Sequence, residues 1–161
     1  MNTAPIHDAA ALTRHIETRY HARHRDQLPA LAAMAARVED VHFGEPGVPC
    51  GLSLLLHRMS GEMEVHMKKE ELILFPAIRK GGMPGIDHPI AVMRADHAAH
   101  DSDLAQIRHL TADLSLPEAA CGTWTRLYQG LEEFIQDLTE HMRLENDVLF
   151  PRFETAGRAH A

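Results

Sequence analysis

The sequence lacks several features that would place it in a broad class at once. Its 161 residues include only two cysteines, Cys50 and Cys121, which are too few for a disulfide framework. No apolar run approaches the roughly 20 residues of a membrane span, and the first 20 residues lack the apolar stretch of a signal peptide. Lys and Arg total 16 against 23 Asp and Glu, a net charge of −7, which disfavours binding to nucleic-acid phosphates. We therefore expect neither nucleic-acid nor membrane partners.

Histidine is the residue that the sequence has in abundance. There are 13 histidines beside the two cysteines, and such a ratio directs attention to imidazole metal ligands. The apolar fraction of 45% and charged fraction of 24% are typical of a globular chain. The length predicts one domain over residues 1–161, large enough to bury a core without disulfides.

Glycine and proline cluster at three places, residues 44–51, residues 81–85 and, more weakly, residues 114–117. The four segments between them repeat apolar residues at intervals of three and four, without the alternation of a strand. This pattern predicts an all-α protein, an up-down-up-down four-helix bundle. Within the first segment, Pro29 predicts a kink or the start of the main helix, and residues 8–19 predict a short extra N-terminal helix.

The second and fourth segments end in near copies of one motif. HMKKEELILFP begins at His66 and HMRLENDVLFP begins at His141, and six of the eleven positions are identical. A His and a Glu four residues apart lie on one helix face, so both can reach one metal centre. In an antiparallel bundle these ends are level with the starts of the first and third helices. The Leu-Phe-Pro that closes each copy is expected to plug that end of the bundle.

A buried group of imidazoles and carboxylates requires compensation, which a metal ion supplies. A carboxylate can bridge two ions, whereas an imidazole binds one, so Glu70 and Glu145 predict a dinuclear site. The remaining imidazoles come from the first and third segments, where two histidines on each stripe qualify: His21 or His24, and His97 or His100. Nitrogen and oxygen donors without thiolates favour iron or manganese over zinc.

Further motifs add a resemblance to a known family. Tyr20 to Arg25 (YHARHR), then Leu28-Pro29, Val48-Pro49 and the two Leu-Phe-Pro motifs resemble the hemerythrin-like domain, and within it the di-iron proteins that repair iron–sulfur clusters. The resemblance runs from about residue 6 to residue 153. It implies two iron ions, oxo- or hydroxo-bridged when oxidised, with manganese as the alternative. It implies six metal ligands: His21, His66, Glu70, His97, His141 and Glu145.

The resemblance also implies a cytoplasmic role in restoring clusters damaged by nitric oxide or oxidants. The expected partners are NO and O₂ as small ligands and damaged iron–sulfur proteins as transient contacts. Repair proteins often carry an additional N-terminal domain with a cysteine pair, and this sequence has no such pair. His42 matches a histidine of the family without a known role, and Cys50 and Cys121 are expected at the bundle end opposite the metal.

Two departures from oxygen-carrying hemerythrins disfavour a simple oxygen store. Those proteins have a second histidine four residues after the ligand of the third helix, where this chain has Asp101. Their last motif ends in an aspartate five residues after the histidine, whereas Glu145 follows His141 by four. An O₂- or NO-binding or redox-sensing module is the alternative function, and a di-metal oxidase ranks third. Whether the protein is an enzyme is left open.

Overall fold

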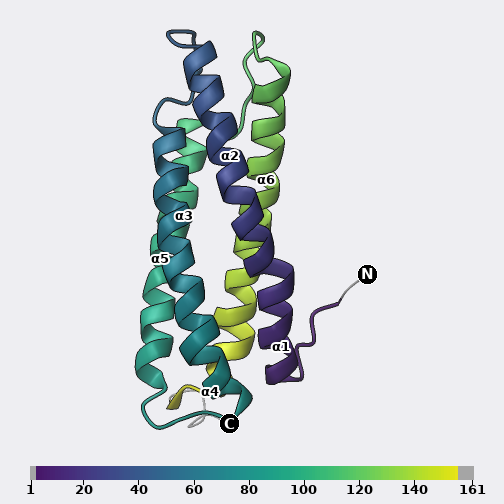
Figure 1. Cartoon of the computed structure of the whole chain (residues 1–161), viewed down its shortest axis with the longest axis vertical. Helices are drawn as coiled ribbons and strands as arrows, with labels where there is room; N and C mark the ends of the chain where they lie inside the picture. Colours follow the sequence, from purple (N-terminus) through teal and green to yellow (C-terminus); the bar gives the residue numbers. More distant parts are fainter. Residues whose placement is uncertain (1–2, 156–161) are drawn as a thin grey trace.

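The computed structural model describes residues 3–155, whose regular structure is helical throughout and forms four rods (Figure 1). The first rod joins α1 (Ala9–His15), the π-helical η1 (Ile16–His21) and α2 (Ala22–Val41). The second joins α3 (Leu52–Lys69), the π-helical η2 (Glu70–Leu74) and α4 (Phe75–Arg79). The third is α5 (Asp87–Leu110). The fourth joins α6 (Gly122–Arg143), the π-helical η3 (Leu144–Leu149) and the 3₁₀-helical η4 (Phe150–Arg152).

The rods pack in chain order around the bundle. The α2 helix packs against α3 and α6, and α5 packs against the same two helices. The connections 42–51 and 111–121 lie at one end, the top of Figure 1, and the connection 80–86 lies at the other. The all-α, up-down-up-down bundle predicted from the sequence is therefore confirmed.

Two details of the first rod refine the prediction. The short N-terminal helix is present as α1, and it continues through η1 into α2, because the residues at both junctions, Ile16 and Ala22, keep right-handed helical angles. Pro29 lies inside α2 and does not mark its start. Residues 22–28, on the N-terminal side of Pro29, are already helical, so the main helix begins at Ala22.

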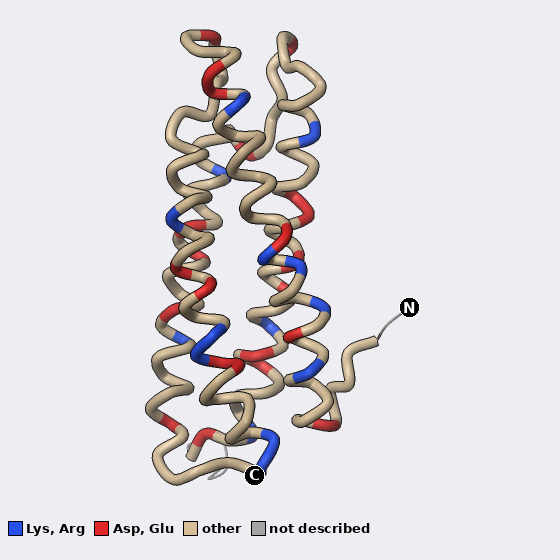
Figure 2. The backbone as a smooth tube through the Cα atoms, in the orientation of Figure 1, with Lys and Arg blue, Asp and Glu red and all other residues tan. Residues whose placement is uncertain are grey.

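Basic and acidic residues are interspersed along the described rods in the view of Figure 2. Among the described residues, no helix is both long enough and apolar enough to span a bilayer.

The repeated motif produces the same distortion in two rods. The N–H of Phe75 bonds to the carbonyl of Glu70, and the N–H of Phe150 bonds to the carbonyl of Glu145, five residues back in each case. A proline follows each phenylalanine. Proline lacks an N–H and its ring crowds the carbonyl four residues back, and a widened turn relieves both problems. Single π turns inside α-helices are common at functional sites.

Two apolar clusters fill the bundle, and a polar layer separates them along every rod. The larger cluster contains Trp124 and Phe134 and extends toward the 42–51 connection. The smaller contains Leu74, Phe75, Leu149 and Phe150, the apolar pairs of the two Leu-Phe-Pro motifs. These residues close the polar layer on its other side, as the sequence predicted. The layer is thus inside the bundle and not at its extreme end.

Replacing Phe134 with alanine is expected to lower the free energy of unfolding by about 3–5 kcal/mol, the range for an aromatic removed from a packed core. Its side chain is fully buried, and its ring packs edge-on against His24 with centroids 5.6 Å apart. Urea unfolding of the metal-free protein measures the change without a contribution from bound metal. Phe43→Ala is the matched control, because Phe43 is 87% exposed. Equal losses for both variants would contradict the packing described here.

Candidate metal centre

The polar layer is built from the six side chains singled out in the sequence. The first rod supplies one histidine, where η1 meets α2, and α5 supplies another from its middle. The second and fourth rods each supply a His and a Glu, on either side of the point where the π turn begins. None of the six is more than 2% exposed. The structure brings together His21, His66, Glu70, His97, His141 and Glu145.

Their donor atoms form two groups that share both carboxylates. One group is His21, His141 and the two glutamates, and the other is His66, His97 and the same two glutamates. Within each group the donor atoms lie within 4.8 Å of one another. Glu70 Oε1 lies 3.2 Å from the Nε2 atoms of both His21 and His66. Glu145 faces His97 through Oε1 at 2.9 Å and His141 through Oε2 at 2.7 Å.

The centre of this arrangement holds polar atoms without hydrogen-bond partners among the described residues. They are the Nε2 atoms of His21, His66 and His97, both carboxylate oxygens of Glu70, and Oε1 of Glu145. A buried polar group left in this condition costs about 1–3 kcal/mol. All six atoms are metal donors, and all point to the same volume. The residues therefore fit a metal centre, and the donor set excludes one built on thiolates.

The outward nitrogen of each histidine is held by a further side chain. The Nδ1 atom of His21 lies 2.7 Å from Glu71 Oε2, and that of His66 lies 2.9 Å from Asp96 Oδ2. The Nδ1 atom of His97 lies 2.8 Å from the amide oxygen of Asn146. Such contacts fix the ring orientation and leave Nε2 free to bind a metal ion.

Two of these outer partners follow a rule that the sequence analysis missed. Glu71 and Asn146 each come directly after a motif glutamate, and each holds the histidine of the preceding rod. The sequence did offer one signal for these partners: both residues occupy the same position in the two copies of the motif. Arg25 in turn binds both oxygens of Glu71 and bonds to Glu64, which anchors the outer carboxylate.

The two histidines left open as alternatives lie beside the donor groups and not in them. His24 Nε2 is 3.0 Å from His141 Nδ1, so His24 is the outer partner of that ring. The ring of His100 packs edge-on against His66, with centroids 5.0 Å apart. Burial, followed by the charge of neighbouring histidines, lowers the pKa of His24 to about 2 and that of His100 to about 4. Both rings are therefore neutral at pH 7.

In the metal-free protein, the layer is held together by ionised pairs. Burial lowers the pKa of His21 and His66, but contacts with Glu70 and the outer carboxylates outweigh it and raise both to about 9. Burial raises the pKa of Glu145, whereas contacts with Glu70 and His97 bring it down to about 2. Burial keeps the pKa of His141 well below its usual value. Metal binding must therefore displace protons from imidazoles at neutral pH.

Glu71→Gln is expected to weaken metal binding by about 10–100-fold, the usual effect of losing an outer partner of a metal-binding histidine. The amide cannot supply the negative charge that faces both His21 and Arg25. Titration of the metal-free chain with Fe²⁺ under anaerobic conditions measures the affinity. Glu64→Gln is the control, since Glu64 pairs with Arg25 without touching His21. A Glu71→Gln protein that binds as tightly as the control would refute this role.

Comparisons with known proteins place the site in context. The sequence model of the hemerythrin HHE cation binding domain matches residues 12–153. A protein of Edwardsiella ictaluri named iron-sulfur cluster repair protein YtfE is 48% identical over 149 residues, which cover 92% of this chain and 66% of the relative. Proteins of the same name from Yersinia pseudotuberculosis and Citrobacter koseri are 49% and 46% identical over 85% and 93% of this chain. The chain spans about two thirds of the length of these relatives.

Proposed function

Since the chain belongs to the hemerythrin HHE cation-binding family, we propose that it is a non-haem di-iron protein that serves in the repair of iron–sulfur clusters damaged by nitric oxide or oxidants. The observation that carries the proposal is the pair of donor groups sharing Glu70 and Glu145. The relatives at 46–49% identity bear the name of iron–sulfur cluster repair proteins, which supports iron over manganese.

In the proposed centre, Glu70 and Glu145 would be shared by two ions. His21 and His141 would hold one ion, and His66 and His97 would hold the other. Bound iron would supply a redox couple and a place for NO or O₂. The phenyl rings of Phe75 and Phe150 stack on His21 and His97, at interplanar angles of 11° and 7°. This apolar cover excludes water from the side of the smaller cluster.

A surface pocket between α3 and α5 reaches one of the ligand candidates. It has a volume of about 380 Å³, and its lining includes His66, His100, Glu62, Lys69 and Asp96. His66 is the ligand candidate that this pocket reaches. We infer that small ligands, and iron as cargo, enter and leave on this side.

The position of Asp101 favours repair over oxygen storage. It is exposed on α5, where oxygen carriers have a further histidine, and it belongs to neither donor group. The proposed centre therefore has equal numbers of histidines in its two halves. Stopped-flow mixing of the Fe²⁺-loaded protein with O₂ separates the functions: rapid irreversible oxidation supports repair, and a stable reversible adduct supports an oxygen-binding module.

The direct test is restoration of a damaged [4Fe–4S] hydro-lyase. The iron-loaded chain is expected to bind NO, seen as a new absorption band, and to restore the activity of an NO-treated hydro-lyase. A Glu70→Gln/Glu145→Gln variant prepared in the same way is expected to do neither. Glu132→Gln, a change on the exposed side of α6, serves as the matched control. Failure of the wild-type chain in both assays, at a measured content of two irons, would overturn the proposal.

A further inference from the structure

A second cluster of reactive side chains lies at the opposite end of the bundle, where α2 ends and α6 begins. His42 follows the last residue of α2, and its ring is only 7% exposed. The ring packs against the indole of Trp124, with centroids 4.9 Å apart. Its Nδ1 atom lies 2.7 Å from Glu45 Oε2. The carboxylate and the indole therefore fix the orientation of this imidazole.

His42 and Cys121 both contact Trp124, the imidazole through the indole ring and the thiol through the backbone N–H. The Nε2 atom of His42 is buried and has no conventional hydrogen-bond partner among the described residues. Contacts with the Cys121 side chain and with Glu45 raise the pKa of His42. Cys121, His42 and Glu45 thus stand in the order nucleophile, base and orienting carboxylate, the general arrangement of an activated nucleophile.

The backbone of α6 adds to the activation of Cys121. This residue caps the 22-residue helix, and its Sγ accepts the N–H of Trp124 at 3.4 Å. That hydrogen bond, followed by the contact with His42, lowers the pKa of the thiol. A helix N-terminus and a neighbouring imidazole are the two settings that favour a thiolate. Because Cys121 is partly exposed, the thiolate remains open to reagents.

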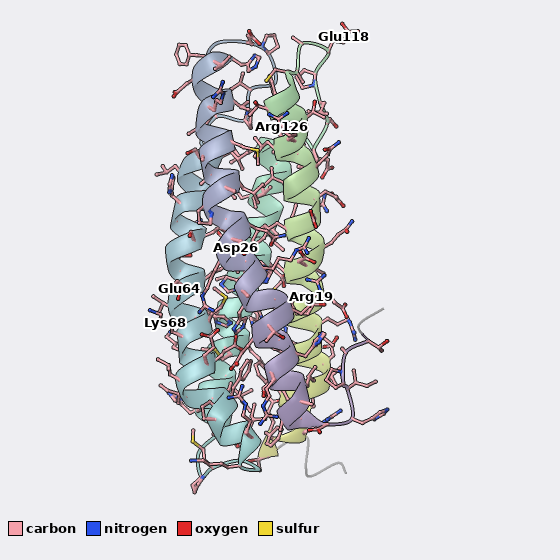
Figure 3. The ribbon with its side chains drawn as sticks, turned by 45° about the vertical axis from the view of Figure 1, so that its right-hand side comes forward. Arg19, Asp26, Glu64, Lys68, Glu118 and Arg126 are labelled. Carbon is pink, nitrogen blue, oxygen red and sulfur yellow. The ribbon has the colours of Figure 1, made fainter. Side chains whose placement is uncertain are left out.

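Two arginines lie in the pocket that contains Cys121. A surface pocket of about 310 Å³ opens at this residue, between α2 and α6. Arg37 lines it from α2 and Arg126 from α6, and none of the described residues that line it is acidic. The Arg126 guanidinium lies close over Gly122, since a β-carbon built there would be 3.3 Å from its Nη1 atom. Figure 3 shows Arg126 near this end of the bundle, far above Glu64 and Lys68.

We propose that Cys121, His42 and Glu45 form a thiol–disulfide exchange site for low-molecular-weight disulfides that carry carboxylates. His42 takes the thiol proton, and the Cys121 thiolate attacks one sulfur of the disulfide. The disulfide bond breaks, a mixed disulfide forms on Cys121, and the other sulfur leaves as a thiolate that receives the proton from His42. The Cys121 sulfur is oxidised and the leaving sulfur is reduced, so the added disulfide is the only oxidant. Arg37 and Arg126 hold the carboxylates.

The first test compares the two cysteines of the iron-loaded chain. Cys50 is exposed and serves as the internal reference. With glutathione disulfide, the Cys50→Ser protein is expected to gain one glutathionyl group at least about ten times faster than the Cys121→Ser protein, because its thiol is activated. Intact-mass spectrometry follows both reactions, and unchanged iron content shows that the distant centre is not involved. Equal rates for the two variants would overturn the proposal.

The second test changes the charge of the reagent and of the pocket. Cystamine has the same reactive bond but two positive charges, so Cys121 is expected to prefer glutathione disulfide. Arg126→Gln, made in the Cys50→Ser background, is expected to slow only the anionic reagent, by about threefold, as fits one exposed charge. A preference of Cys121 for cystamine, or equal slowing of both reagents by Arg126→Gln, would refute the anion selectivity.

The third test addresses His42 and Glu45. Alkylation of Cys121 by iodoacetamide across pH is expected to reach its half-maximal rate at a higher pH in His42→Gln, and at an intermediate pH in Glu45→Gln. Because Glu45 is exposed, its variant keeps the test valid if His42→Gln fails to fold. Fluorescence of Trp124, the one tryptophan of the chain, reports on the local fold. A Glu45→Gln protein with an unchanged midpoint and an unchanged exchange rate would exclude Glu45 from the site.

Discussion

Replacing Glu70 with glutamine is expected to empty both halves of the proposed metal centre, although the change is made at one residue. Glu70 faces His21 and His66, one from each donor group, through the same carboxylate. An amide there loses the charge that offsets two cations, and its nitrogen cannot bind a metal. We expect the affinity for each ion to fall by more than about 100-fold, which exceeds the loss caused by removing an outer partner of a ligand.

A histidine substitution provides the contrast that tests bridging. His66 belongs to one donor group only, so His66→Gln is expected to weaken one ion strongly and to leave the other largely bound. Metal content is measured by mass spectrometry after gel filtration. We expect nearly no bound metal in Glu70→Gln and about one ion per chain in His66→Gln. Glu132→Gln, on the exposed side of α6, should retain both ions. If Glu70→Gln keeps one full ion, the carboxylate does not bridge.

Removing the metal is expected to lower the melting temperature by roughly 15–30 °C. Two ions at about 1,000 times their dissociation constants each stabilise the fold by about 4 kcal/mol. For a domain of this size, each kcal/mol corresponds to about 2–4 °C. The physical origin is the buried layer of donor atoms, where His–Glu ion pairs stand in for the metal and six atoms make no hydrogen bond among the described residues.

Calorimetry before and after dialysis against a chelator measures this difference. Adding Fe²⁺ anaerobically to the metal-free chain should restore the melting temperature, and the Glu70→Gln/Glu145→Gln protein should not respond to either treatment. A metal-free protein that melts within a few degrees of the loaded one would show that the polar layer is satisfied without metal.

Much of the fold and of the candidate site followed from local patterns in the sequence. A His and a Glu four residues apart on an apolar stripe can only point into the bundle, so His66, Glu70, His141 and Glu145 were evident. Spacing could not separate His21 from His24, because both lie on one stripe three residues apart. The rotation of the rod decides between them, and that rotation depends on the η1 turn, which no residue pattern in that segment indicated.

Other features depend on packing between rods and left weaker traces in the sequence. Asn146 holds a histidine 49 residues away, and its only trace in the sequence is its place directly after a motif glutamate, which Glu71 shares. His42 and Cys121 meet the same Trp124 from neighbouring rods, and no local pattern indicates that. Of the two alternatives predicted for Pro29, the start of the main helix is wrong, because Pro29 lies inside α2. Pro76 and Pro151, by contrast, follow π turns, which the sequence analysis did not predict.

The four outer partners of the histidines have one more consequence. In the half with His21 and His141, one ring is backed by the Glu71 carboxylate and the other by the neutral His24. In the other half, His66 is backed by the Asp96 carboxylate and His97 by the neutral amide of Asn146. Each half therefore pairs one ring backed by a carboxylate with one ring backed by a neutral group. An exchange of charged and neutral partners within one half, such as Glu71→Gln, would make the two halves unlike.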